Sequence, residues 1–147
     1  MSAAIPARAP LSQEGREYWT NLTTECERQA IAMNAVVSGF GTMPESLIEC
    51  RCGNDLQIRK SGYPSTSVRV SIDYCSWGPM IDGVITGYQD EAQEFCPEEF
   101  TVPIARDLDG SVIAIYEEGR SFSPRELASY LMQSFRRCFP GVSLPCE

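Results

Sequence analysis

The stretch that decides the fold reads Val68-Arg69-Val70-Ser71-Ile72-Asp73-Tyr74, then Cys75-Ser76-Trp77-Gly78-Pro79, then Met80-Ile81-Asp82-Gly83-Val84-Ile85-Thr86-Gly87-Tyr88. The first run alternates apolar and polar residues without interruption, which is typical of a strand with one buried and one solvated face. The middle run has the composition of a turn, and the third run is again apolar enough for a strand. We therefore predict a β-hairpin over 68–88, at the centre of an antiparallel sheet.

A second hairpin is predicted over 48–60, and its register can be tested on the sequence. If Gly53-Asn54-Asp55 is a three-residue loop, Cys50 faces Ile58 and the apolar residues of both strands share one face. A loop one residue shorter would move one set of side chains to the other face, so the pattern selects the three-residue loop.

A third hairpin is predicted over 100–117, with Asp107-Leu108-Asp109-Gly110 as its turn. Asp107-x-Asp109-Gly110 is similar to the start of a calcium loop, but Asp-Gly between two apolar strands favours a hairpin turn. Pro103 has no N–H to donate, which predicts an edge strand or a bulge. The run 90–99, with five acidic residues and no basic one, is interpreted as a solvated loop.

Two helices enclose the strands in the sequence. Residues 13–38 have an apolar stripe at steps of three and four: Trp19, Leu22, Cys26, Ala30, Met33 and Val37. Ser123 as N-cap, Pro124 at the first position and Glu126 at the third predict a helix over 124–138. We expect an α+β fold of about six hairpin-linked strands with both helices on one face. Residues 1–10 are expected to form a flexible arm and 11–147 a single domain.

Composition argues against several classes of partner. The 147 residues include 20 acidic and 12 basic ones, a net charge of −8. This balance disfavours binding to nucleic acid and to anionic membranes. The chain has neither an apolar run of roughly 20 residues, as a membrane helix needs, nor the apolar core of a signal peptide. These features predict a cytoplasmic protein.

The chain contains no histidine, so Ser-His-Asp and Cys-His catalysis are excluded for the chain acting alone. Cys50-x-Cys52 on one strand would place two thiols on the same face, but a zinc site needs two further ligands, for which Cys75 and Cys96 are candidates only by elimination. Cys138 and Cys146 would pair only in an oxidising compartment. We interpret the seven cysteines as mostly reduced core residues and expect no metal and no cofactor.

The functional hypothesis that remains is a non-enzymatic domain that binds another protein or forms a homodimer. Small size, acidity and a helix-flanked sheet loosely resemble adaptors and secretion chaperones. The candidate interaction face comprises Arg69, Ser71 and Asp73 on the solvated side of the central hairpin, with Trp77 at its tip. Two alternatives stay open: a small-ligand-binding domain or enzyme with a pocket between sheet and helices, and a cysteine metal site.

Overall fold

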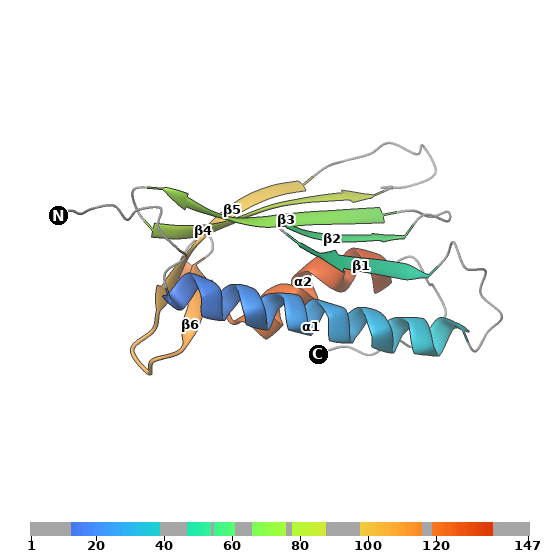
Figure 1. The fold of residues 1–147 in the computed structure, drawn as a ribbon, viewed down its shortest axis with the longest axis horizontal. Coiled ribbons are helices and arrows are strands. Elements are labelled where there is room, and N and C mark those ends of the chain that lie inside the picture. Colours follow the sequence, from blue (N-terminus) through green and yellow to red (C-terminus); the bar gives the residue numbers. More distant parts are fainter. Residues whose placement is uncertain are drawn as a thin grey trace.

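The computed structural model describes residues 13–38, 47–53, 55–60, 66–75, 78–87, 98–115 and 119–136. These residues form a helix, a seven-stranded antiparallel sheet and a second helix, which confirms the predicted α+β class (Figure 1). Their order is α1 (Gln13–Ser38), β1 (Ile48–Cys52), β2 (Asp55–Lys60), β3 (Thr66–Cys75), β4 (Gly78–Gly87), β5 (Glu98–Arg106), β6 (Val112–Ile115), β7 (Ser121–Phe122) and α2 (Pro124–Arg136).

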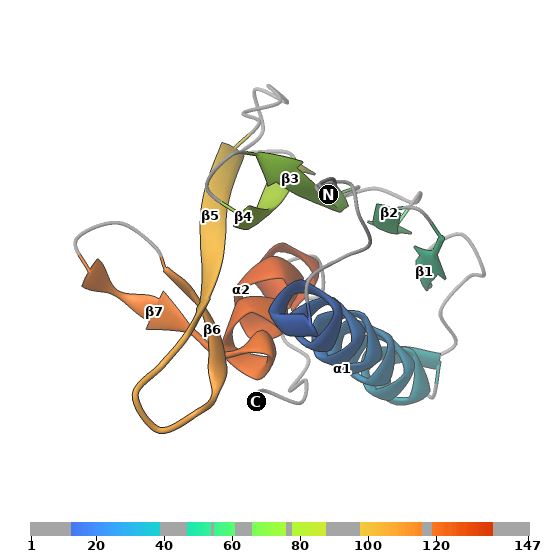
Figure 2. The same cartoon turned by 60° about the vertical axis from the view of Figure 1, so that its left-hand side comes forward.

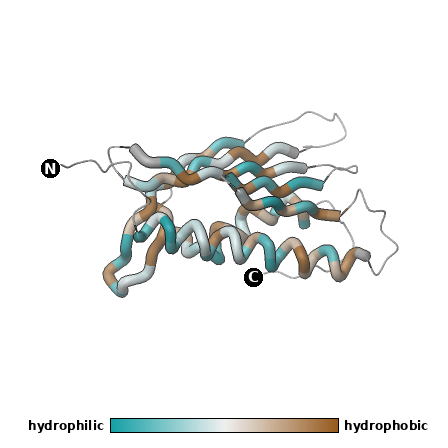
Figure 3. Tube along the Cα trace, in the orientation of Figure 1, coloured by the Kyte–Doolittle hydropathy of each residue, from teal (hydrophilic) through white to brown (hydrophobic). Residues whose placement is uncertain are grey.

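The sheet is a meander, in which each strand pairs with its neighbours in the sequence. The register predicted for the first hairpin is confirmed, with Cys50 opposite Ile58 and Ile48 opposite Lys60. The central hairpin is longer than the alternating pattern indicated, because pairing continues to Cys75 opposite Gly78. Hydropathy alternates along the strands, as Figure 3 shows, and this alternation gives the sheet one apolar and one polar face.

β5 connects two parts of the sheet that face in different directions. Up to Pro103 it pairs with β4, and from Ile104 to Arg106 it pairs with β6. The edge position predicted from Pro103 is therefore wrong, since β5 has a neighbour on each side along different parts of its length. Pro103 is the last residue of β5 paired with β4, opposite Met80, and the next residue, Ile104, is the first paired with β6. Figure 2 shows β5, β6 and β7 turning away from β1–β4 and around α2.

Both helices lie on the same face of the sheet and pack side by side (Figures 1 and 2). Their buried side chains, together with those of the strands, form one core. On α1 the fully buried stripe begins with Tyr18 rather than with Trp19, which is only half-buried. Tyr18 can be buried because its hydroxyl donates a hydrogen bond to the Phe122 carbonyl at 3.0 Å. On α2 the buried side chains among the described residues are Leu127, Ala128, Leu131, Met132 and Phe135.

Local signals at the ends of elements are confirmed in detail. Ser123 and Glu126 form a reciprocal capping box, in which each backbone N–H donates to the other side chain, at 2.8 and 3.1 Å. The turn after β5 closes with Asp107 N–H donating to the Ser111 carbonyl at 2.7 Å, and Gly110 has a φ of 91°. The strand β7 was not predicted, because two residues carry no periodicity.

In the part of the chain that the structure describes, no helix has the length and apolarity to span a membrane.

Candidate functional site

The face of the sheet opposite the helices is the candidate functional site, and we call it the open face. The strand register arranges its side chains in rows that cross the strands. One row runs Arg51, Gln57, Arg69, Val84, Glu99, and the next runs Asp55, Ser71, Asp82, Thr101. Because side chains in a strand alternate between faces, every member of these rows points away from the core formed by Leu56, Val70 and Ile81.

Charged side chains on the open face are held by contacts between neighbouring strands. Arg69 Nε donates to Asp55 Oδ2 at 2.9 Å, and this guanidinium lowers the pKa of the Asp55 carboxyl. Arg59 donates to Glu49 Oε1 at 3.3 Å, and the Thr101 hydroxyl donates to Asp82 at 2.8 Å. Such exposed pairs contribute little to stability. What they provide is a fixed arrangement of charges on a rigid surface.

An apolar area lies within this polar surface. Val84 is 36% exposed and has Arg69 and Glu99 as its cross-strand neighbours. Half-buried Met80, beside half-buried Pro103, lies two outward-facing positions further along β4, and Asp82 separates it from Val84. A mainly polar surface with a small apolar centre is the composition found in many non-obligate protein interfaces.

The structure places the predicted site residues on one face, but in different surroundings. The Arg69 side chain is 70% exposed, Asp73 is exposed and Ser71 is half-buried between Asp55 and Asp82. Trp77 lies outside the described residues, so its place at the tip of this face stays a prediction. Sequence reasoning missed Asp55 and Asp82. The sequence assigned Asp55 to the loop of the first hairpin, whereas in the structure it begins β2 and lies opposite Ser71.

Three of the cysteines lie near one another between α1 and β1. Cys26 is fully buried, Cys50 is half-buried and Cys52 is exposed, and all three are free thiols. Burial, with Glu27 and Cys52 nearby, raises the pKa of the Cys50 thiol to about 11. Burial raises the pKa of Cys26 still further. Among the described residues no group of three or more Cys, Asp and Glu side chains has a metal-binding arrangement. Cys96, Cys138 and Cys146 lie outside the described residues, and of Cys75 only the backbone is described.

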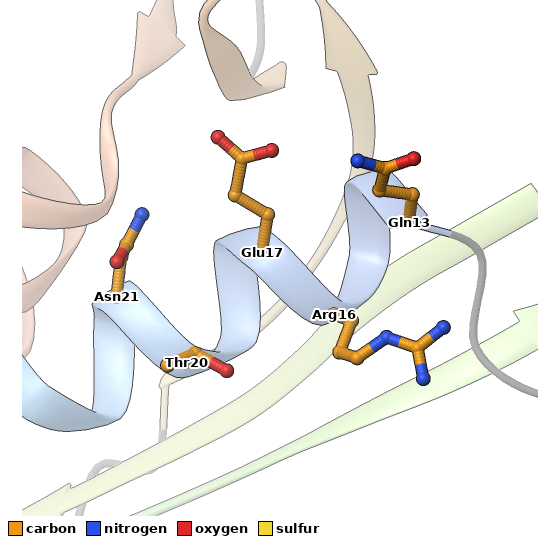
Figure 4. A pocket seen from close by; sticks show the side chains of 5 residues that line it. All are labelled: Gln13, Arg16, Glu17, Thr20 and Asn21. Atoms are coloured by element: carbon orange, nitrogen blue, oxygen red, sulfur yellow. The ribbon is translucent and has the colours of Figure 1, made fainter.

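Two hollows are lined by described residues, and neither contains a predicted site residue. The larger, about 360 Å³, lies along the first turns of α1 and is lined by Gln13, Arg16, Glu17, Thr20 and Asn21. Figure 4 shows all five side chains on this one helix, with Arg16 pointing away from Glu17. The smaller, about 30 Å³, lies on the open face between Glu49, Arg51, Gln57 and Arg59. Among the described residues, the lining of the larger hollow comes from one helix, and a single helix does not enclose a small molecule.

No family model matches the chain, and neither a curated protein nor a solved structure is significantly similar to it.

Proposed function

We propose that this chain is a protein-binding module that uses the open face. The observation that supports the proposal is the packing of both helices on one side of the sheet, which leaves the outward rows of β1–β5 without a covering layer among the described residues (Figure 2). An antiparallel sheet can keep one face in water by itself. This face differs from a merely solvated one in its exposed Val84 and in its paired charges.

The chemistry of the open face indicates a partner surface that is flat and carries both signs of charge. The row from Arg51 to Glu99 has cations near β1 and an anion on β5, with Val84 between them. A complementary protein would place an acidic group over Arg69 and an apolar side chain on Val84. Complementary charge on this pattern would fix orientation and speed association more than it would raise affinity.

The test is a binding experiment with two variants of equal chemistry on opposite sides of the molecule. R69E/S71R changes charge and shape in the centre of the open face. R16E/T20R makes the same kind of change on exposed positions of α1. Immobilised wild-type protein and both variants are exposed to extract of the source cell, and the bound proteins are compared by quantitative mass spectrometry.

We expect a partner that wild type and R16E/T20R retain and that R69E/S71R loses. That partner, once purified, should also reduce hydrogen exchange at β3 and β4 in the wild-type protein. Circular dichroism and thermal unfolding establish that both variants are folded. Retention of every bound protein by R69E/S71R would contradict a role for the open face.

A further inference from the structure

β1 forms an edge of the sheet, and no described strand lies beyond it (Figures 1 and 2). Hydrogen bonds at its two ends show which backbone groups face outward. Ile48 directs both its N–H and its C=O to the Asn34 side chain, at 2.8 Å each, while Gly53 N–H donates inward to the Asp55 carbonyl. Because these directions alternate along an antiparallel strand, Cys50 and Cys52 also direct their N–H and C=O groups away from β2.

We propose that two copies of this chain pair antiparallel through β1, centred on Cys50, and so form one continuous sheet. In this arrangement Cys50 of each copy donates its N–H to the Cys50 carbonyl of the other. Antiparallel pairing of two identical strands has two-fold symmetry, which closes the assembly at two copies. The side chains of Glu49 and Arg51 belong to the rim of the open face, but the pairing uses the backbone of the β1 edge and does not depend on the function proposed for the centre of that face.

The charges on β1 select this register over its neighbours. Residues that lie opposite each other in the two copies must have their side chains on the same face of the combined sheet. The register can therefore shift only by two residues at a time. When Cys50 of one copy lies opposite Cys50 of the other, Glu49 of each copy lies opposite Arg51 of the other copy. The interface therefore contains two such pairs of opposite charge. The two nearest alternatives place Glu49 opposite Glu49, or Arg51 opposite Arg51, and like charges directly opposite are unfavourable. Only the Cys50-centred register makes β1 complementary to itself.

The ion pairs within one chain leave a cation available for this contact. Arg59 is paired with Glu49 and Arg69 with Asp55. Arg51 lies opposite Gln57, is exposed, and has no acidic partner within the described residues. Glu49 is 56% exposed despite its contact with Arg59, so one of its oxygens remains accessible to Arg51 of a second copy.

A second observation on α1 points to the same edge. Ile31 is 67% exposed, and it is the one large apolar side chain that is exposed on the described part of α1. It lies three residues before Asn34, which binds Ile48, and four after Glu27, which is close enough to Cys50 to raise its pKa. Residues three and four apart share a helix face, so Ile31 lies on the side of α1 next to β1. A second copy brought to this edge would cover it with its own Ile31.

Asn34 sets a limit on the association. In the proposed register Cys52 of the second copy takes the position beside Ile48 that the Asn34 amide occupies. Pairing along the whole strand therefore replaces the two Asn34–Ile48 hydrogen bonds with backbone hydrogen bonds at each end. Protecting an edge strand in this way is a common device against indiscriminate pairing, and it makes the dimer reversible and dependent on concentration.

The test is sedimentation velocity of the full chain over a range of concentrations at low ionic strength. The wild type should shift from monomer to dimer as concentration rises. E49R carries two cations on this face of β1, and R51E carries two anions, so each should dimerise roughly tenfold more weakly or worse. An equimolar mixture of E49R and R51E should form a heterodimer, because both cross-strand pairs are again of opposite charge.

Two further variants separate pairing from loss of fold. R59Q removes the ion pair within the chain but leaves both partners of the proposed contact, so it should dimerise at least as strongly as wild type. N34A frees Ile48 and should raise the dimer fraction at a given concentration. The proposal is overturned if wild type stays monomeric up to its solubility limit, if E49R and R51E dimerise as wild type does, or if their mixture does not associate.

Discussion

Gly83 has only a hydrogen atom as its side chain, and this leaves space in the core for the ring of Phe100. It lies opposite Phe100 in the β4–β5 pair, and a Cβ at this position would come within 2.2 Å of the far end of the Phe100 ring. Phe100 is 7% exposed, and its ring packs edge-on against the Tyr130 ring, with 6.2 Å between the two ring centroids. The Phe100 ring therefore has little room to move. The sequence shows a glycine within a strand, but the ring that requires it comes from a tertiary contact.

We predict that G83A lowers the free energy of unfolding by about 1–3 kcal/mol, the usual cost of overpacking a core. F100L shortens the opposing side chain, so G83A should cost less in the F100L background than in wild type. Urea unfolding of the four proteins of this double-mutant cycle gives the coupling energy. A G83A protein as stable as wild type would show that the ring adjusts freely.

Buried ionisable groups on α1 predict how stability depends on pH. Burial raises the pKa of the Cys26 thiol above its ordinary value near 9.0 and that of the Tyr18 hydroxyl above 10.0. The folded state therefore holds these protons more tightly than the unfolded state does. This contribution is complete below the unfolded pKa values and is lost as pH rises above them.

The free energy of unfolding should accordingly be level from pH 7 to 8 and fall above about pH 9, with Cys26 contributing up to ~1.4 kcal/mol per pH unit. Urea unfolding at intervals between pH 7 and pH 10.5 measures the slope. C26A lacks the thiol and should show a shallower decline, although its stability at pH 7 is lower. An unchanged slope in C26A would mean that other groups cause the alkaline loss.

At the scale of the elements, a few adjacent helix-capping residues were sufficient to predict the start of α2. The Ser123–Glu126 capping box satisfies two backbone N–H groups that the helix leaves without partners. S123A should lower the free energy of unfolding by about 1 kcal/mol. S121A, an equivalent change on exposed β7, should alter it by less than about 0.5 kcal/mol. Thermal and urea unfolding of the two variants compares them, and equal effects would contradict the capping role.

Elements with a strong local pattern were predictable, and those defined by distant contacts were not. Alternation and turn residues predicted the three hairpins and the register of the first. β7 is too short for a pattern, and Glu98 and Glu99 belong to β5 although the acidic run 90–99 indicated a loop; residues 90–97 lie outside the described residues. The choice between Tyr18 and Trp19 depended on the Phe122 carbonyl, 104 residues away. Likewise, no local signal marks Asn34 as the side chain that binds Ile48.

At the scale of the whole molecule, the sequence predicted which side of the sheet carries the candidate site. It did not predict which residues of the neighbouring strands complete that site. The sequence indicated that Arg69, Ser71 and Asp73 point away from the core, and the packing of α2 beside α1 leaves that side uncovered among the described residues. The rows that add Asp55, Asp82 and Val84 require the register between successive hairpins, which the pattern within one strand does not give. The two proposals are tested at different places, because E49R and R51E change the rim of the open face at β1 and R69E/S71R changes its centre on β3.

The packing of α1 against α2 has a consequence for how the chain is made. Every strand pairs with a neighbour in the sequence, so the sheet can assemble in step with synthesis. α2, however, follows all the strands, and it fills the space between α1 and the curved half of the sheet (Figure 2). Until α2 leaves the ribosome, the apolar side of the nascent sheet has only α1 to cover it, and such exposed surface invites misassociation. Shielding of this surface by a cellular chaperone would therefore matter most in the interval between the synthesis of β7 and that of α2.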